Sequence, residues 1–266
     1  LTGVSVKNGA LCAVQADGQD IACERAVLAI GHSARDTFAA LHGNGVYFEP
    51  KAFSVGVRIE HLQTEIDRAL YGKAAGHPML PPAEYNLSRR ADGRACYSFC
   101  MCPGGVVVAA QSEENTVVTN GMSYHARDGK NANAAVVVSV GAEDFAGDPR
   151  RAIAFQRELE AKAYAAGTVT VQRKNSGAYA APAENVQSFL EGKGQLNIGR
   201  VEPTYDRGVV AADLGALLPG ELADTLRAGL RAYERKIAGY TAPEAILTGL
   251  ETRTSSPVRL KREETL

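Results

Sequence analysis

The first residues of the chain alternate between apolar and polar positions, which is the pattern of half-buried β-strands. Within residues 1–16 the alternation surrounds Asn8-Gly9, and these two residue types accept the positive φ angles that a tight hairpin turn requires. A second turn at Asp17-Gly18 leads to Ile21–Cys23. The pattern therefore predicts a small antiparallel sheet at the start of the chain.

A continuous apolar run, Ala26–Ile30, follows this sheet and ends at Gly31. Such a run predicts a buried strand, and Ser33 then marks the beginning of a helix over Ala34–Leu41. A helix that begins after a glycine turn presents backbone N–H groups to an anion or to the edge of a ring. Many strand–helix turns share this pattern, so by itself it indicates no particular ligand.

Residues Phe53–His61 alternate strictly, which predicts a strand with two different faces. Three β-branched residues share one face: Val55, Val57 and Ile59. The other face carries Arg58 and Glu60. We interpret these two charged residues as a solvated face, as a diagonal pairing with neighbouring residues, or as part of a site.

A strand predicted over Arg94–Met101 runs into Pro103-Gly104-Gly105 and is followed by the apolar strand Val106–Val108. Proline fixes the entry to the turn and glycine allows a tight return, so the pattern predicts a hairpin. Cys100 and Cys102 lie two residues apart, and side chains at this spacing on a strand point to the same side. We therefore expect both thiols on one wall of a pocket.

Three interpretations of Cys96, Cys100 and Cys102 remain open. As zinc ligands they lack the usual spacing, and no second cysteine pair follows. As a redox pair, Cys100 and Cys102 are close in the chain, although a bridge across one residue is strained. As structural residues, they are simply small buried hydrophobes. Our set of site residues contains no metal ligand.

The segment Asn120–Asn133 is a polar loop that contains His125 and precedes the apolar strand Ala134–Val140. Loops between core strands often carry binding and catalytic residues. An ordinary turn-rich connection has the same composition, so both interpretations stay open.

Helical patterns dominate the second half of the chain. Helices are predicted over Leu62–Tyr71, from Asp148-Pro149 to Ala166, from Ala181-Pro182 onward, and from Leu218-Pro219-Gly220 to Gly239. The last should be the longest, with one buried stripe: Leu222, Leu226, Leu230, Tyr233 and Ile237. Strands mainly before residue 140 and helices mainly after it predict an α+β fold with a mixed sheet.

The chain has 266 residues, enough for one large domain or two smaller ones. A net charge of −1 gives no electrostatic reason to expect binding to nucleic acid or to an anionic membrane. No apolar run reaches the length of a membrane span, about 18 residues. Five cysteines, an odd number mixed into apolar strands, are typical of a reducing compartment, so we expect a cytoplasmic protein.

Three segments together resemble one family: Ala29–Asp36, Ser98–Gly105 and Glu251–Arg259. This family comprises the bacterial FAD-dependent dehydrogenases of largely uncharacterised function, also described as NAD- or FAD-utilising dehydrogenases. Two shorter segments, Pro81–Tyr85 and Val118–Met122, are similar as well. The resemblance covers nearly the whole chain, but it is only loose over Gly167–Asn185.

The resemblance implies an oxidoreductase that uses FAD, with NAD(P)H as a possible co-substrate and a small molecule as substrate. A member of this family should carry an N-terminal G-x-G-x-x-G segment for the FAD pyrophosphate, and that motif is absent from this sequence. We therefore expect a fragment that is colourless on its own. Residues 1–50 and 251–266 would be truncated parts of a Rossmann-like flavin-binding domain, and residues 51–250 an inserted substrate or cap domain.

Two sets of residues are assigned, the first of them by the same resemblance. The residues expected near FAD are Gly31, His32, Ser33, Arg253, Thr254 and Ser255. The candidates for the substrate face are Arg58, Cys100, Cys102 and His125. A positive group near a flavin stabilises its anionic reduced form, a role open to Arg58 or Arg253. The alternative function is a non-catalytic cap or partner-binding domain attached to a flavoprotein.

Overall fold

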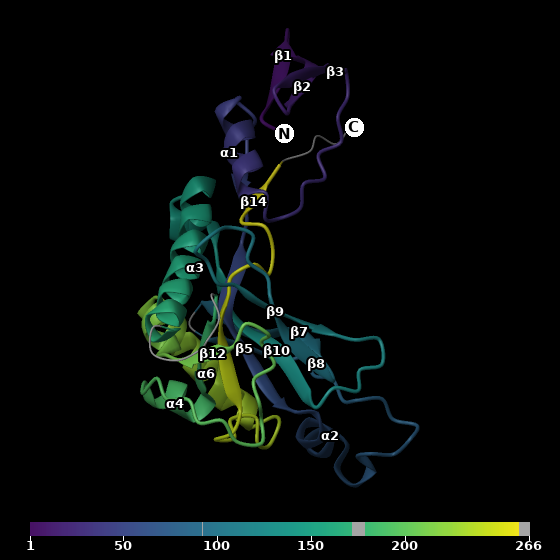
Figure 1. Ribbon diagram of the computed structural model, residues 1–266, viewed down its shortest axis with the longest axis vertical. Helices are drawn as coiled ribbons and strands as arrows, with labels where there is room; N and C mark the ends of the chain where they lie inside the picture. Colours follow the sequence, from purple (N-terminus) through teal and green to yellow (C-terminus); the bar gives the residue numbers. More distant parts are fainter. Residues whose placement is uncertain (92, 172–178, 261–266) are drawn as a thin grey trace. The chain divides into compact units, whose positions relative to one another are not determined.

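The computed structural model describes residues 1–91, 93–171 and 179–260, which form two compact units (Figure 1). The smaller unit comprises residues 1–53, 141–155 and the segment that starts at Ser255. The larger unit comprises residues 54–140 and 156–254. Of the segment predicted over 251–266, residues 261–266 lie outside the described residues. The assignment of a flavin-binding role to the chain ends stays a prediction.

The smaller unit begins with the predicted antiparallel sheet. Its strands are β1 (Gly3–Lys7), β2 (Ala10–Ala16) and β3 (Gln19–Ala22), paired in the order β1-β2-β3. Asn8 and Gly9 have φ angles of 51° and 80°, as a primed hairpin turn requires. The alternation and the turn residues thus predicted this sheet correctly.

The strand predicted over Ala26–Ile30 is not formed, and this prediction was wrong. A strand needs a neighbour for its backbone N–H and C=O groups, and no described segment pairs with these residues. Val27 is 95% exposed as a result. The helix that follows is present as α1 (Arg35–Gly43).

The core of the smaller unit joins segments that are far apart in the sequence. Helix α1, the start of α3 (Pro149–Val171) and strand β14 (Val258–Arg259) contribute to it, and β14 pairs with β4 (Glu49–Pro50). The η2 turn (Ala142–Phe145) belongs to the same unit. Its buried apolar residues are Phe38, Leu41, Phe48, Ile153 and Val258. All described strand pairs of this unit for which a direction is given are antiparallel, so a Rossmann-like remnant also stays a prediction.

The larger unit is built on a mixed seven-stranded sheet in the order β12-β11-β13-β5-β10-β7-β6. Its strands are β5 (Phe53–Leu62), β6 (Ser88–Ala91), β7 (Arg94–Cys102), β10 (Asn131–Val140), β11 (Ala181–Asn185), β12 (Val209–Ala211) and β13 (Ile246–Glu251). Strands β11 and β12 are parallel, whereas β7 is antiparallel to both of its neighbours. The predicted α+β class is confirmed.

Helices pack against this sheet. Among those that pack on it are α4 (Val186–Glu191), α5 (Leu214–Leu217) and α6 (Gly220–Glu234). The other described helices that follow β5 in the chain are α2 (Gln63–Tyr71), with the η1 turn (Gly72–Ala74), and α3 (Pro149–Val171). The predicted apolar stripe lies on α6, which packs on β7 and β10 (Figure 1). The longest helix is α3, and Ala181-Pro182 begins a strand, contrary to prediction. Within the described ranges, no helix is both long and apolar enough to cross a membrane.

Strand β5 is buried on both faces, so the interpretation of its polar side as a solvated face was wrong. A separate ribbon of β8 (Gly105–Ala109) and β9 (Thr119–Ser123) packs on the seven-stranded sheet. The hairpin predicted between β7 and β8 is therefore wrong. Both edges of β7 are already paired, with β10 and β6, so the chain must leave the sheet after Pro103.

We predict that Gly56→Ala destabilises the larger unit. A Cβ atom at Gly56 would lie 2.0 Å from the carbonyl oxygen of Val136, and a neighbouring strand cannot yield easily. The free energy of unfolding in urea should fall by about 1–3 kcal/mol or more. The matched control is Gly220→Ala, where an added Cβ meets no atom within 4 Å. An equal effect of the two substitutions would show that the contact between β5 and β10 does not require glycine.

Candidate functional site

Arg58, on strand β5, is fully buried and lies at the centre of a network of polar side chains. Its Nε donates to one carboxylate oxygen of Glu251 at 2.6 Å, and its Nη2 donates to the other at 2.9 Å. Glu251 is the last residue of β13, the strand next to β5. This bidentate pairing matches the planar fork of the guanidinium to the carboxylate, which makes it a strong and specific contact.

The remaining donors of Arg58 are also engaged. Nη1 donates to Asn133 at 2.8 Å and to the main-chain oxygen of Cys100 at 3.1 Å. Nη2 donates to the Oδ1 of Asn120 at 3.3 Å. Strand β9 crosses above the guanidinium at Gly121, where a Cβ atom would lie only 2.0 Å from Nη1. Glycine is therefore required at this position of the ribbon.

The electrostatics of this pair follow from its burial. Burial alone would lower the pKa of Arg58, but the Glu251 carboxylate outweighs it and holds the pKa above the ordinary value. Burial raises the pKa of Glu251, and the guanidinium opposes that shift. Because arginine keeps its proton in proteins and both carboxylate oxygens accept an N–H, we assign the pair as ionised.

A β-bulge interrupts β7 beside Arg58. Cys102 pairs with Asn133 and Phe99 pairs with Ala135, so Cys100 and Met101 together face one residue of β10. Cys100 adopts a left-handed backbone with φ 47°. A bulge reverses the alternation of side chains. The spacing of Cys100 and Cys102 therefore does not place both thiols on one wall, as the sequence predicted for a regular strand.

The bulge separates Cys96 from the other two clustered cysteines. Cys96 faces helix α6, because a Cβ atom on Gly229 would lie 2.3 Å from its sulfur. Cys102 lies on the other side, with its sulfur 3.9 Å from Nη1 of Arg58. Cys100 is exposed, while Cys102 is buried. The three thiols do not converge on one point, and no metal-binding cluster of cysteine, histidine, aspartate or glutamate occurs in the part of the chain that the structure describes.

A pocket of about 420 Å³ lies at the bulge. Its lining residues come from β7 and from the segment before β6: Glu84, Tyr85, Asn86, Ser98, Phe99, Cys100 and Met101. Phe99 is 42% exposed, and the Cys100 thiol is exposed beside it. The pocket therefore offers a thiol and an aromatic ring to a small molecule.

His125, the fourth residue predicted on the substrate face, is placed elsewhere. It is exposed in the connection between β9 and β10 and does not line this pocket. Part of the loop predicted over Asn120–Asn133 belongs to β9 and β10. Of the predicted substrate-face residues, the structure thus brings together Arg58, Cys100 and Cys102.

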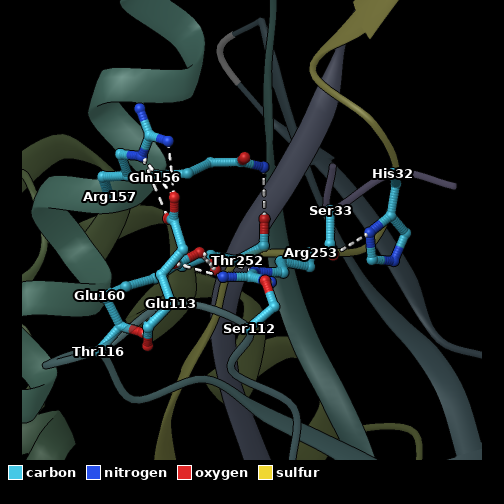
Figure 2. Close-up of polar contacts among 10 residues, drawn as sticks. All are labelled: His32, Ser33, Ser112, Glu113, Thr116, Gln156, Arg157, Glu160, Thr252 and Arg253. Carbon is cyan, nitrogen blue, oxygen red and sulfur yellow. Dashed lines mark hydrogen bonds and ion pairs between the residues drawn. The ribbon is translucent and has the colours of Figure 1, made fainter. Parts of the chain in front are cut away.

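Arg253 lies in a second buried network, drawn in Figure 2. Its Nη2 donates to the carboxylate of Glu160 at 2.8 Å, and its Nη1 donates to Ser112 at 2.6 Å. Thr252 donates to the same carboxylate at 2.7 Å and accepts at its main-chain oxygen from Gln156 at 2.8 Å. These contacts fix the segment after β13 to helix α3.

The next two residues of this segment bond to main-chain groups. Thr254 accepts from the N–H of Ser54 at 3.0 Å and donates to its carbonyl oxygen at 3.1 Å. Ser255, in the smaller unit, lies 3.5 Å from the carbonyl oxygen of Ala52. Contact of these side chains with FAD stays a prediction, because each already has a partner within its own unit.

The residues Gly31, His32 and Ser33 lie in the smaller unit, before α1. Gly31 has a φ angle of 72° and open space around it, and Nδ1 of His32 lies 2.7 Å from Oγ of Ser33 (Figure 2). A dinucleotide cradle needs a strand that leads into a glycine-rich turn at a helix N-terminus. Residues 26–30 form no strand, so these residues do not by themselves fit the FAD pyrophosphate.

Sequence reasoning missed several members of both networks. They are Asn120, Gly121, Asn133, Glu160 and Glu251. Glu251 stands in a segment that carries the resemblance, but its partner Arg58 is 193 residues away, and no periodicity connects two such positions. Gly121 fell in the segment predicted as a polar loop, whereas the structure places it in β9.

We predict that Glu251→Gln strongly destabilises the protein. The substitution leaves the charge of Arg58 buried without an anion, which should lower the free energy of unfolding by about 3–5 kcal/mol. The double variant with Arg58→Met and Glu251→Leu should lose less than the sum of its single variants. The control is Glu158→Gln in an exposed pair with Lys162, with an effect of about 0.5 kcal/mol or less. If Glu251→Gln and Glu158→Gln lowered the free energy of unfolding equally, the buried pair would not have the proposed stabilising effect.

Glu60, also on the polar side of β5, should make stability depend on pH. Burial raises the pKa of Glu60, and hydrogen bonds from Thr204 and Asn131 only partly oppose it. A raised folded-state pKa stabilises the protein below the unfolded value, about 4.3, and this contribution is lost as pH rises through the folded-state pKa. Glu60→Gln should therefore gain stability relative to the wild type as pH rises from about 4 to 7. Urea unfolding across this range measures the difference, and a gap that does not vary with pH would refute the role of Glu60.

Comparison with known proteins shows which family the chain belongs to. The chain is 45% identical over 269 aligned positions to an uncharacterized protein of Clostridium beijerinckii. The alignment includes all of this chain but only 49% of that relative, so the chain spans about half the length of the protein it matches. A family model described as "FAD-dependent protein, C-terminal domain-like" matches residues 52–254. The chain therefore belongs to the family of C-terminal-domain-like segments of FAD-dependent proteins.

Proposed function

We propose that this chain is the substrate-side part of an FAD-dependent oxidoreductase, a dehydrogenase. The observation that carries the proposal is the family match over residues 52–254, which runs over the larger unit with its exposed thiol pocket. Because the chain spans about half of its relative, the activity belongs to the full-length protein. A cytoplasmic location is part of the proposal.

FAD would be held mainly by a segment outside this chain. This follows from the smaller unit, where Gly31, His32 and Ser33 lack the strand that a pyrophosphate cradle needs. When bound, FAD supplies hydride or electron transfer, with NAD(P)H as the proposed co-substrate. This chain would contribute one side of the flavin pocket and the surface that receives the substrate.

The role of Arg58 in this proposal is positioning. Its guanidinium has no exposed surface, and its Nη1 holds the main-chain oxygen of Cys100 at 3.1 Å. Arg58 thereby fixes the backbone at the mouth of the pocket without touching a substrate. The residues that can touch a substrate are those with exposed atoms in the pocket, above all Cys100 and Phe99.

One observation favours the alternative, a non-catalytic cap or partner-binding domain. Arg58 and Arg253, the two cations proposed to act on a flavin, both form ion pairs inside the larger unit. A domain that only covers the flavin would use its polar residues in this way. The two functions differ in whether the bound flavin is reduced by a nicotinamide.

The test is made on the full-length protein that contains this chain. We expect it to purify with FAD and to lose its flavin absorption when NADH or NADPH is added without oxygen. The chain of residues 1–266, purified separately, should be colourless. Flavin that photoreduction bleaches but neither nicotinamide reduces would favour the cap function. A full-length protein without flavin would overturn both.

A further inference from the structure

The two thiols at the bulge occupy complementary positions. Cys100 is exposed and lines the pocket, whereas Cys102 is 6% exposed and lies behind it. The Cys102 sulfur lies 3.2 Å from the main-chain oxygen of Cys100. An incoming molecule in the pocket can therefore reach Cys100 but not Cys102.

Arg58 lies behind both thiols. Its Nη1 is 3.1 Å from the carbonyl oxygen of Cys100 and 3.9 Å from the sulfur of Cys102. Burial raises the pKa of the Cys102 thiol to about 11, the Arg58 charge opposes this shift, and the neighbouring Cys100 thiol adds to it. The buried thiol is thus kept protonated near neutral pH, next to a cation that can stabilise it when it gives up its proton.

The bulge also reduces the obstacle to a bridge between the two residues. On an extended strand, residues two apart have Cα atoms about 6.6–6.8 Å apart, at the upper limit for a disulfide, about 6.8 Å. Cys100 and Met101 share one partner on β10, so one of them is free of the ladder. A small contraction there would bring the Cα atoms into the normal range.

We propose that Cys100 and Cys102 form a dithiol pair that reduces a small disulfide bound in the pocket. The Cys100 thiolate attacks one sulfur of the substrate, which forms a mixed disulfide and releases one thiol. The Cys102 thiol then attacks the Cys100 sulfur, which forms the Cys100–Cys102 disulfide. Its proton goes to the departing thiolate, which leaves as the second thiol. The pair is oxidised by two electrons, and the substrate disulfide is reduced by two.

This inference rests on the proposed function, because it names the substrate class of the same pocket. The two are nevertheless separable, since the exchange of one equivalent needs neither flavin nor nicotinamide. Failure of the thiol exchange with normal reduction of the flavin would remove the substrate assignment alone. Failure of flavin reduction with normal exchange would remove only the dehydrogenase.

The experiment treats the full-length protein, first reduced and freed of reductant, with hydroxyethyl disulfide. After an acid quench and alkylation of free thiols, mass spectrometry follows the tryptic peptide 95–127, which contains Cys96, Cys100 and Cys102 but neither Cys12 nor Cys23. We expect Cys96 to be alkylated, Cys100 and Cys102 to be joined, and two thiols to be released for each Cys100–Cys102 bridge, in addition to any thiol that the exposed Cys12 releases. Dithiothreitol should restore three alkylated cysteines.

The variants separate the two steps. Cys102→Ser should stop at one mixed disulfide on Cys100 and release one thiol, while Cys100→Ser should lose the reaction. Cys96→Ser is the matched control and should behave as the wild type. Cys102→Ala is a second replacement at the same position and should give the same result as Cys102→Ser. Thermal unfolding of each variant shows whether a loss of the thiol exchange reaction reflects misfolding. A wild type that keeps the mixed disulfide, or a Cys100 that does not react, would overturn the proposal.

Discussion

The arrangement of the larger unit depends on the ion pair between Arg58 and Glu251. Two charges on adjacent strands can be buried only if their hydrogen-bonding capacity is met, because the loss of hydration is otherwise prohibitive. The pair itself joins β5 to β13, and the ribbon and β10 supply Asn120 and Asn133 to the remaining donors. The polar side of β5 therefore packs against the ribbon of β8 and β9, and Gly121 allows the ribbon to approach closely.

The bulge in β7 follows from the same requirement and creates the pocket. Cys100 contributes its carbonyl oxygen to Arg58 while its side chain stays exposed. A regular strand would continue the alternation that places Cys96 on the helical side, and Cys102 would then also face α6. The extra residue instead turns Cys102 toward the guanidinium. One backbone irregularity thus separates a structural thiol from the pair proposed to react.

Local patterns predicted the elements that depend on local physics. The Asn8-Gly9 hairpin, helix α1 and the stripe of α6 follow from turn chemistry and from the periodicity of apolar residues, and all three are present. The failures arise where distant segments compete for the same backbone groups. Residues 26–30 have strand composition but no described partner, and β8 cannot pair with β7 because β6 and β10 already do. The contact of Arg58 with Glu251 is likewise a property of strand order, which alternation alone does not specify.

The segment Glu251–Thr254 explains why residues that carry a resemblance need not carry the chemistry. Glu251 neutralises Arg58, Arg253 neutralises Glu160, and Thr254 bonds to the backbone of Ser54. Each side chain thus stabilises a junction between strands or between a strand and helix α3. A polar side chain that is bound to a buried partner would have to break that contact before it could bind a substrate. Breaking the contact costs several kcal/mol. Chemistry is therefore better sought at side chains that combine reactivity with exposure, and among the cysteines of the larger unit this is Cys100.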